Sequence, residues 1–458
     1  MMNVFNSLTR KVEELKPLEG NEVRLYTCGP TVYNFAHIGN FRAYAFEDIL
    51  RRVVEFNGMK VKQVMNLTDV DDKTIRGANA ANVPLTDYTK TYKDAFFADL
   101  KKLNIESAEI YPAATDHIPE MIALVSTLIE KGVAYQSDDG SVYFNVRKFP
   151  GYGKLAHIDF DNQRTGARCA SDEYDKENVG DFALWKAWEE SDGPVGWDSP
   201  WGRGRPGWHI ECSAMSMKYL GETFDLHTGG IDNLFPHHEN EIAQAEAATG
   251  KPFVNTWMHC AHLKVNGEKM SKSLGNFFTL RDLIEKGWSG REIRYVLVNA
   301  HYRQGLNFAF SALEDARKSL ERIDRAVDAL QGRIDAAEAT PDFAKKALED
   351  FAAAVNDDLN IPKAFAALFE LVRETNASGT KAQGVLDAFK RMDEVLGVIF
   401  FGKKEKEDIP SEIAALLEER AAARAAKDWA QSDRLRDEIA AKGWLVKDSK
   451  EGQSCTKK

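Results

Sequence analysis

The sequence predicts an α/β protein whose first part is built on a parallel sheet and whose last part is helical. In the first part, short apolar runs such as 23–27 and 61–67 alternate with segments of helical periodicity, which is the order of elements in a parallel sheet. Beyond about residue 306, long segments rich in Ala, Leu, Glu, Lys and Arg follow one another, as in a helical bundle.

The elements follow this division in order. The early strands and helices are expected at 23–27, 41–56, 61–67 and 88–103. The stretch from about 111 to 225 breaks the rhythm with many turn residues and short strand candidates such as 141–145, so we expect an insertion in the sheet domain. A strand near 253–259 then closes the sheet. The later helices are expected at 312–338, 343–357, 361–375, 382–398, 411–427 and 429–442, with a linker at 402–410.

Composition limits the class of protein. With 458 residues, 43% of them hydrophobic, the chain can bury two or three domain cores. It has no apolar run of about 18 residues and no apolar leader at its start, so we expect a cytoplasmic protein without a membrane segment. Five scattered cysteines fit reduced thiols or metal ligands better than a disulfide framework. The net charge of -11 means that an RNA partner would have to meet local basic patches.

Two short segments far apart in the chain indicate nucleotide activation. His37-Ile38-Gly39-Asn40 comes where a helix should start, and backbone N–H groups, an imidazole and an amide there can bind phosphate. Lys269-Met270-Ser271-Lys272-Ser273 supplies lysines and hydroxyls in a loop flanked by glycines, which suits a polyphosphate. Each segment alone is weak, because such a histidine is commonly a helix cap and such a loop is commonly just solvated. The two together carry the prediction.

A third group of residues indicates a metal. His237 and Glu241 are four residues apart after Pro236, so they would share one helix face. Cys28 and Cys212 lie in segments expected near the same crevice, and two thiolates, an imidazole and a carboxylate suit Zn²⁺. Spacing alone leaves the ligand set open, with these competitors: His209, His227, His238 and Glu239.

The motifs resemble those of known enzymes. The first two segments resemble the HIGH and KMSKS signatures of class I aminoacyl-tRNA synthetases, with Asn40 in place of the second His, where an amide can still donate a hydrogen bond. The strings at 26–33, 66–73 and 235–241 resemble cysteinyl-tRNA synthetases. The resemblance implies a Rossmann-like catalytic domain over 1–305 with a connective insertion at about 111–225, a helical bundle over 306–402 and a small C-terminal anticodon-binding domain over 411–458. It also implies a monomer.

The same resemblance implies a two-step reaction. ATP with Mg²⁺ would activate L-cysteine as cysteinyl-adenylate, and the cysteine would pass to the 3′ end of tRNA(Cys). The catalytic residues would be His37, Asn40, Lys269 and Lys272. ATP would be held by Gly39, Gly230, Asp232 and Lys272, with Asp232 accepting from ribose hydroxyls. One Zn²⁺ per chain would be held by Cys28, Cys212, His237 and Glu241, and would select the substrate thiol because sulfur binds zinc better than a hydroxyl does. The cysteine would lie beside Gly29, Thr68 and Trp208.

Structural alternatives remain open for several of these residues. Gly29 could simply make a turn, Thr68 could cap the segment 69–79, and Trp208 could be core packing. The acidic residues Asp69, Asp71 and Asp72 are interpreted as helix-start charges rather than a Mg²⁺ site.

The helical bundle and the last domain are where an RNA would dock. The basic residues that could contact phosphates in the last domain are Arg420, Arg424, Lys427, Arg434, Arg436 and Lys442. Family members commonly carry a base-stacking tryptophan near the C-terminus. This chain has Cys455 near that place, so we predict either weaker anticodon dependence or a substitute such as Trp444.

Two other functions compete with this interpretation. One is a cysteine ligase acting on an amino sugar in thiol-cofactor biosynthesis, and the other is a non-catalytic module that senses cysteine or RNA. The domain beyond about residue 411 disfavours the first, and the retained signature and ligand residues disfavour the second.

Overall fold

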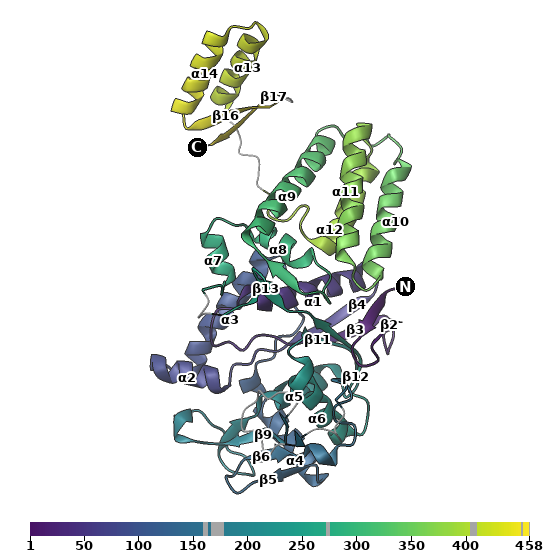
Figure 1. Cartoon of the computed structure of the whole chain (residues 1–458), viewed down its shortest axis with the longest axis vertical. Coiled ribbons are helices and arrows are strands. Elements are labelled where there is room, and N and C mark those ends of the chain that lie inside the picture. Colours follow the sequence, from purple (N-terminus) through teal and green to yellow (C-terminus); the bar gives the residue numbers. More distant parts are fainter. Residues whose placement is uncertain (159–163, 166–177, 272–274, 404–409, 450–451, 458) are drawn as a thin grey trace. The chain divides into compact units, whose positions relative to one another are not determined.

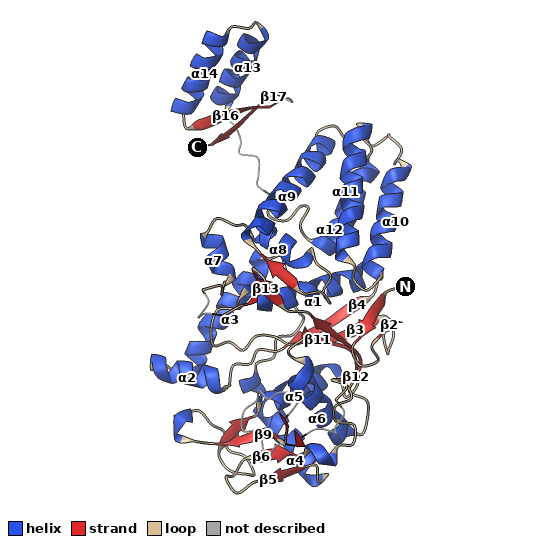
Figure 2. Cartoon of the chain, in the orientation of Figure 1, coloured by secondary structure: helices blue, strands red, loops and turns tan. Residues whose placement is uncertain are grey.

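The computed structural model describes residues 1–158, 164–165, 178–271, 275–403, 410–449 and 452–457. The chain divides into two compact units, Met1–Gly402 and Lys403–Lys458. Figures 1 and 2 show that the first unit combines a central sheet with surrounding helices. The described part of the second unit holds two helices and a hairpin. None of the described helices is both long and apolar enough to cross a bilayer.

The centre of the first unit is a four-stranded sheet in the order β12-β11-β3-β4. Its strands are β3 (Glu22–Thr27), β4 (Lys60–Met65), β11 (Phe224–Gly230) and β12 (Val254–Cys260), and every neighbouring pair is parallel. Most side chains of β3 and β11 are buried, as expected for strands covered on both faces. The predicted parallel α/β fold is therefore confirmed.

Helices make the crossovers of this sheet. The helix α1 (Ile38–Phe56) joins β3 to β4, and α6 (Glu239–Thr249) joins β11 to β12. After β4 the chain forms α2 (Asp72–Ala81) and α3 (Leu85–Lys102) before it leaves the sheet. The carboxyl ends of β3 and β11 thus meet α1 and α6 at one edge, where ligands bind in sheets of this kind.

The segment between β4 and β11 contains a second four-stranded sheet, antiparallel, in the order β10-β9-β6-β5. Its strands are β5 (Ala134–Gln136), β6 (Val142–Phe144), β9 (Phe182–Ala187) and β10 (Gly204–Pro206), with α4 (Ile118–Glu130) packed beside them. A short parallel pair, β7 (Arg164–Thr165) and β8 (Asn178–Val179), lies in the same segment. The helix that ends it, α5 (Trp208–Leu220), also packs on β3 and β4, so its residues reach the edge of the central sheet.

The chain after β12 forms a small sheet and then the helical bundle. The small sheet has the order β14-β13-β15, with β13 (Leu263–Val265), β14 (Glu268–Lys269) and β15 (Leu306–Phe308). Along the chain, α7 (Leu280–Glu285) and α8 (Gly290–Val298) lie between β14 and β15. The bundle helices are α9 (Phe310–Gln331), α10 (Asp342–Asn356), α11 (Ile361–Ser378) and α12 (Gln383–Leu396). These four match the predicted helical segments. A hairpin of β1 (Asn3–Asn6) and β2 (Lys11–Glu14) begins the chain and lies beside β12.

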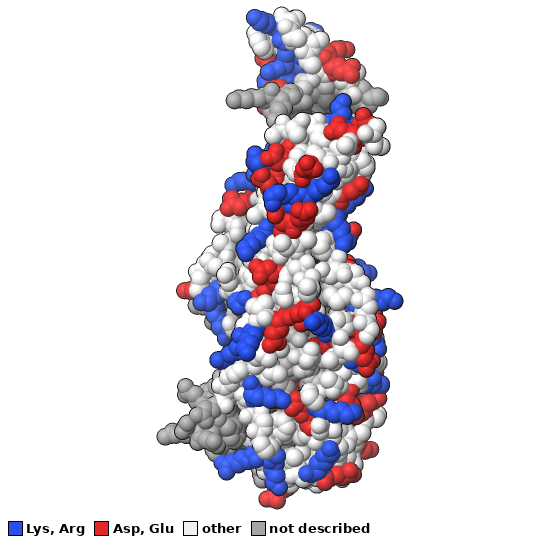
Figure 3. Space-filling model, turned by 90° about the vertical axis from the view of Figure 1, so that its right-hand side faces the viewer, with Lys and Arg blue, Asp and Glu red and all other residues white. Residues whose placement is uncertain are grey.

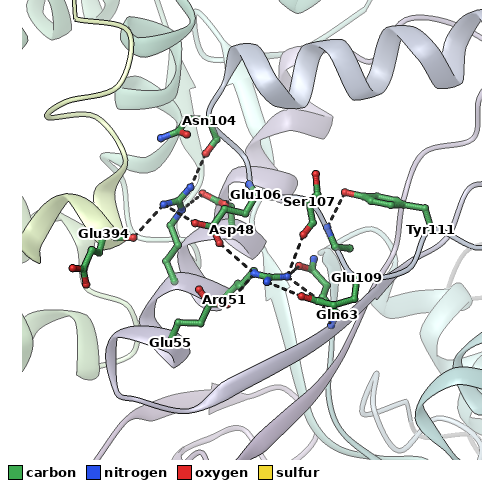
Figure 4. Close-up of polar contacts among 12 residues, drawn as sticks. Asp48, Arg51, Glu55, Gln63, Asn104, Glu106, Ser107, Glu109, Tyr111 and Glu394 are labelled. Carbon is green, nitrogen blue, oxygen red and sulfur yellow. Dashed lines mark hydrogen bonds and ion pairs between the residues drawn. The ribbon is translucent and has the colours of Figure 1, made fainter. Parts of the chain in front are cut away.

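A buried polar cluster ties α1 to the helices around it. The Asp48 Oδ2 atom accepts hydrogen bonds from Arg52 Nε at 2.8 Å and from Arg294 Nη2 at 2.6 Å. The two arginines also donate to the carbonyl oxygens of Glu394 and Leu396 at the end of α12, at 3.1 and 2.9 Å. Figure 4 shows Asp48 and Glu394 of this cluster together with the neighbouring ion pairs of Arg51 with Glu106 and Glu109, in the segment that follows α3. The signature helix is therefore held firmly against the bundle.

The second unit is a helical pair closed by a hairpin. It contains α13 (Ser411–Ala425), α14 (Trp429–Ala441), β16 (Trp444–Ser449) and β17 (Gly452–Lys457), and the two strands are antiparallel. Its core is formed by Ile413, Ile439 and Trp444, the last only 6% exposed. The suggestion that Trp444 offers a stacking platform is therefore wrong, because its ring fills the core of a very small unit.

Five of the six basic residues expected to contact RNA phosphates have partners within this unit, and three of them, Arg424, Arg434 and Arg436, pair with Asp448, Gln431 and Asp433. Arg420 is buried and donates to both carboxylate oxygens of Asp448, at 2.8 and 2.9 Å, which removes it from the candidates. Lys442 pairs with Glu412 at 2.6 Å on the surface. The exposed aromatic side chain here is Trp429, 57% exposed, with the Arg424 guanidinium 5.7 Å from its ring centroid.

Candidate active site and metal centre

The first signature forms the start of α1, as predicted. His37 is the N-cap: its Nδ1 accepts a hydrogen bond from the Asn40 backbone N–H at 3.2 Å, and the Asn40 side-chain Oδ1 accepts one from the His37 N–H at 3.1 Å. The common capping role of such a histidine is thus present. The cap also fixes the remaining chemistry, since the ring proton of a neutral His37 must lie on Nε2 and the Asn40 amide keeps its N–H donors.

The second signature loop lies against this helix start. A Cβ atom at Gly39 would lie 2.7 Å from the terminal methyl carbon of Met270, so glycine permits the close approach of loop and helix. Lys269 is exposed at the end of β14. Lys272 lies outside the described residues.

The chain just after the loop also packs on the helix start. The ring of Phe277 is 5.1 Å from that of His37, and the Ile38 N–H donates to the Phe278 carbonyl oxygen at 3.0 Å. The two signatures, which the sequence placed at one crevice, are therefore neighbours.

A glycine turn after β11 completes this edge of the sheet. A Cβ atom at Gly230 would lie 2.4 Å from Asp232 Oδ1, so the exposed Asp232 carboxylate folds back over the strand end. Burial lowers the pKa of His37, and the nearby Asp232 carboxylate opposes that shift. The His37 ring is therefore neutral at pH 7, and it lies within electrostatic reach of Asp232.

Four side chains converge on one point beside these segments. The ligand atoms of Cys28, Cys212, His237 and Glu241 all lie within 4.8 Å of one another. They come from the end of β3, from α5, from the turn Leu234–His238 and from α6. In a tetrahedral site with bonds of about 2.0–2.3 Å, ligand atoms are about 3.3–3.8 Å apart, so the cluster has nearly the dimensions of a zinc site.

The structure also bears on the competing ligands. A second group shares Cys28 and Glu241 and adds His227 and His238. Its atoms are already hydrogen-bonded to one another, since His227 Nε2 lies 2.9 Å from Glu241 Oε2 and His238 Nε2 lies 3.3 Å from Cys28 Sγ. The favoured group has similar internal contacts, since His237 Nε2 lies 3.1 Å from Glu241 Oε1, so the described geometry fits both ligand sets.

Two further competitors have other partners. The Glu239 carboxylate accepts backbone N–H bonds from Gly153 at 2.8 Å and from Leu155 at 2.9 Å, which leaves it turned away from the cluster. His209 Nδ1 lies 2.9 Å from His237 Nδ1. That contact leaves His237 Nε2 to face Glu241 Oε1, at 3.1 Å.

The donor set fits a soft divalent cation. Glu241 is fully buried, and its Oε1 makes no hydrogen bond within the described chain, although it lies close to His237. Burial lowers the pKa of His237 to about 3, so its ring is neutral, the form that binds a metal. The pKa of Cys28 is raised first by its contact with Cys212 and then by burial, and that of Cys212 chiefly by burial. A bound cation reverses this, because a coordinated thiol loses its proton.

The three residues expected around the cysteine lie at the same edge. A Cβ atom at Gly29 would lie 1.8 Å from the Asn66 carbonyl oxygen, so glycine is required where the ends of β3 and β4 meet. The Thr68 hydroxyl donates to Glu211 Oε2 at 2.8 Å, whereas the cap of α2 is Asp71. The alternative in which Thr68 caps that helix is therefore wrong.

Trp208 is partly exposed, at the first position of α5. Its ring stacks on that of His237 with centroids 4.2 Å apart and planes 24° apart. The indole therefore lies against a predicted metal ligand rather than within a hydrophobic core.

The acidic trio has structural partners. Asp71 caps α2 by accepting from the Lys73 N–H, and Asp72 lies in the first turn, as the interpretation as helix-start charges requires. Asp69 differs, because it is buried and pairs with Lys93 at 2.5 Å and with the Thr115 hydroxyl at 2.8 Å. These contacts give the trio no common metal position.

Comparison with known proteins now identifies the family. The model of the tRNA synthetases class I (C) catalytic domain matches residues 14–318. A cysteine–tRNA ligase from Protochlamydia amoebophila is 51% identical and is matched over 98% of this chain and 97% of its own length. The chain belongs to the cysteine–tRNA ligase family. Relatives of the same name from Chlamydia pneumoniae and Brachyspira hyodysenteriae are 50% and 49% identical, each matched over 98% of this chain and over 96% and 98% of their own lengths.

Two further family models match the later part of the chain. The DALR domain model matches residues 350–401, and the cysteinyl-tRNA ligase anticodon binding domain model matches residues 406–455. Among solved structures, a Mycobacterium tuberculosis methionyl-tRNA synthetase with methionyl-adenylate has a TM-score of 0.58 at 15% identity, over 83% of this chain and 89% of that one. An Agrobacterium radiobacter LeuRS in complex with tRNA has a TM-score of 0.59 at 12% identity, over 84% of each chain. At such identities the likeness shows the fold alone.

Sequence reasoning missed two buried acids. Glu211 meets Thr68, and Glu47 on α1 accepts a hydrogen bond from Thr228 Oγ1 at 3.0 Å. Both acids stand at positions that the helical pattern of apolar residues predicts to be buried. Because a buried carboxyl group needs a specific partner, this pattern could have identified them.

Proposed function

We propose how the described residues carry out the reaction of this family. The chain is an aminoacyl-tRNA ligase that attaches cysteine to tRNA, as the names of its relatives state, with ATP as the second substrate. The observation that carries the proposal is the convergence of two thiols, an imidazole and a carboxylate within 4.8 Å of one another beside the two signatures. A nucleotide and a thiol-bearing substrate can thus be bound side by side. We place the reaction in the cytoplasm, with the chain acting as a monomer.

The ATP phosphates are held at the start of α1. His37 Nε2–H and the Asn40 amide donate to phosphate oxygens, with the helix N-terminus adding its own N–H groups. Lys269, and Lys272 of the same signature, neutralise the charge that develops on the α-phosphate and on the departing pyrophosphate, with Mg²⁺ accompanying the nucleotide. Asp232 accepts from the ribose hydroxyls, while Gly39 and Gly230 leave room for the nucleotide.

The cysteine site is built around four ligands, namely Cys28, Cys212, His237 and Glu241. Zinc held there supplies a binding point for the substrate thiolate, a contact that a serine hydroxyl reproduces poorly. Trp208, stacked on His237, forms one wall of the site, and Thr68 and Gly29 lie at the strand ends opposite. Selection by ligand chemistry exceeds what an apolar pocket achieves between near-isosteres.

The described residues on the face of the molecule drawn in Figure 3 form no strongly basic surface for transfer RNA. On the face drawn in Figure 3, Lys and Arg alternate with Asp and Glu, in keeping with the net charge of -11. In the second unit, the exposed Trp429 beside Arg424 has the form of a base-stacking platform. An anticodon-binding model matches this unit, and an enzyme that acts on an amino sugar would have no need of such a domain.

One experiment tests the function and its rival together. The purified enzyme is assayed for cysteine-dependent exchange of pyrophosphate into ATP, and then for cysteine transfer with tRNA(Cys) or an amino sugar as acceptor. We expect exchange with cysteine but not with serine, and transfer to the RNA alone. Exchange that is indifferent to cysteine refutes the assignment of the active site, and transfer to the sugar favours the rival ligase.

A further inference from the structure

Glu47 is a buried carboxyl group to which the mechanism above gives no role. It lies on α1, the helix that His37 caps, and is 1% exposed. Its Oε1 accepts a hydrogen bond from Thr228 Oγ1 at 3.0 Å, whereas its Oε2 has no hydrogen-bond partner within the described chain. Burial raises the pKa of Glu47 to about 8, and the Thr228 hydroxyl only partly offsets this shift. A group so costly to bury must have a specific use.

Its partner Thr228 occupies a central place in the sheet. It lies in β11, paired with Thr27 of β3 on one side and Met258 of β12 on the other. Its carbonyl oxygen accepts from the Cys28 N–H at 3.3 Å. The next two residues, Gly229 and Gly230, end the strand, and the turn to Asp232 follows them. The Glu47–Thr228 hydrogen bond therefore links α1 to the strand from which that turn departs.

We propose that Glu47 is a positioning residue for ATP, which holds Thr228 so that the turn ending at Asp232 keeps a fixed place relative to His37. This inference rests on the proposed function, because it takes those two residues as the ribose and phosphate ends of one nucleotide site. ATP must reach both ends at once. A relative shift of about 1 Å between them misplaces the nucleotide and can cost up to roughly 100-fold in rate.

A role in packing alone would have different measurable effects. A merely structural residue would change stability and both substrate affinities together. The positioning role acts on the nucleotide first, because three of the predicted metal ligands lie outside the turn. The fourth, His237, is held separately by its contact with His209 at 2.9 Å and by the stacked ring of Trp208. The Cys28 N–H bonds to the Thr228 carbonyl oxygen rather than to its side chain. Metal content is therefore expected to stay unchanged.

The test uses three single variants and a double. Glu47→Ala removes the acceptor, Thr228→Val removes the hydroxyl at nearly constant volume, and Glu47→Gln keeps a carbonyl oxygen for the hydroxyl. The double variant combines Glu47→Ala with Thr228→Val. The matched control is Thr375→Val, which removes a buried hydroxyl that bonds to Leu371 O at 2.7 Å within α11 of the bundle. The assay is cysteine-dependent pyrophosphate exchange, with KM measured for ATP and for cysteine, together with metal analysis.

We expect Glu47→Ala and Thr228→Val each to raise the KM for ATP about 10-fold, as loss of one buried hydrogen bond does. The KM for cysteine should change by less than about 2-fold, and the double variant should be no worse than either single one, because the two residues act as a pair. Glu47→Gln should restore most of the ATP affinity, and Thr375→Val should leave both constants unchanged.

The inference is overturned if both KM values rise equally, if Glu47→Gln is as poor as Glu47→Ala, or if Thr228→Val binds ATP normally. Should Glu47→Ala fail to fold, Thr228→Val decides alone. A wild-type enzyme without cysteine-dependent exchange refutes the proposed function instead, whereas an active wild type with an unaffected Thr228→Val refutes only the role of Glu47.

Discussion

Replacing one thiol of the cluster tests the metal centre most directly. Cys212 is 1% exposed, and its sulfur belongs to the group of four ligand atoms within 4.8 Å of one another. Cys260 is a matched control, since it is also a buried cysteine, 2% exposed, at the end of a neighbouring strand and outside both candidate ligand groups. Both are changed to serine, which alters each site by a single atom.

The expected difference is large. Loss of an outer partner of a metal site already lowers affinity about 10- to 100-fold, and loss of a ligand should exceed this. Serine is a poor substitute, because its hydroxyl does not deprotonate near the cation as a thiol does. We therefore expect Cys212→Ser to lose its zinc to a competing chelator and to lose cysteine-dependent exchange, while Cys260→Ser keeps both.

The measurement is metal analysis of the purified proteins before and after titration with the chelator, with unfolding followed in parallel. Full zinc in Cys212→Ser after that titration would refute the assigned ligand set. Equal metal loss in both variants would show that buried thiols are needed for packing rather than for coordination.

Three further outcomes are expected. Trp429→Ala should raise the KM for tRNA about 5- to 150-fold, which corresponds to the free energy of stacking one base, and should leave pyrophosphate exchange unchanged. An unchanged KM for tRNA would contradict the stacking role. Trp208→Ala should raise the KM for cysteine with little effect on the KM for ATP, as checked by exchange kinetics. Asp48→Asn should destabilise the first unit by about 3–5 kcal/mol in urea unfolding, since it removes the anion of the buried Arg294, although Arg52 keeps Glu106 at 3.0 Å. Burial raises the pKa of Asp48, but Arg294 and Arg52 outweigh this and hold it below its usual value, so its contribution is present above the unfolded pKa of about 3.9 and is lost as the pH falls further. The stability gap between wild type and Asp48→Asn should accordingly narrow in acid.

Much of the fold followed from local patterns. Apolar runs and helical periodicity predicted β3, β4, β12 and all four bundle helices, because burial on both faces of a strand or on one face of a helix sets the spacing of apolar residues. The fourth central strand, β11, was missed, because it is short of apolar residues and ends in two glycines. The hairpin Trp444–Lys457 was missed, and with it the burial of Trp444, because its strands carry charges and few apolar residues. Their pairing depends on the core beneath α13 and α14.

The sequence by itself determined the chemistry available to this protein: the two signatures, the helix start at His37, and the thiols, imidazoles and carboxylates from which a metal site could be built. Only the tertiary structure decided which of them meet. Spacing along the chain does not fix which rings of a histidine-rich cluster face a common point. The folded chain brings His237 to one group of possible ligands and His227 and His238 to a second, while His209 bonds to His237. The same holds for Glu47, whose partner lies on another strand. Such pairs form because the sheet brings the carboxyl ends of distant strands together at one edge.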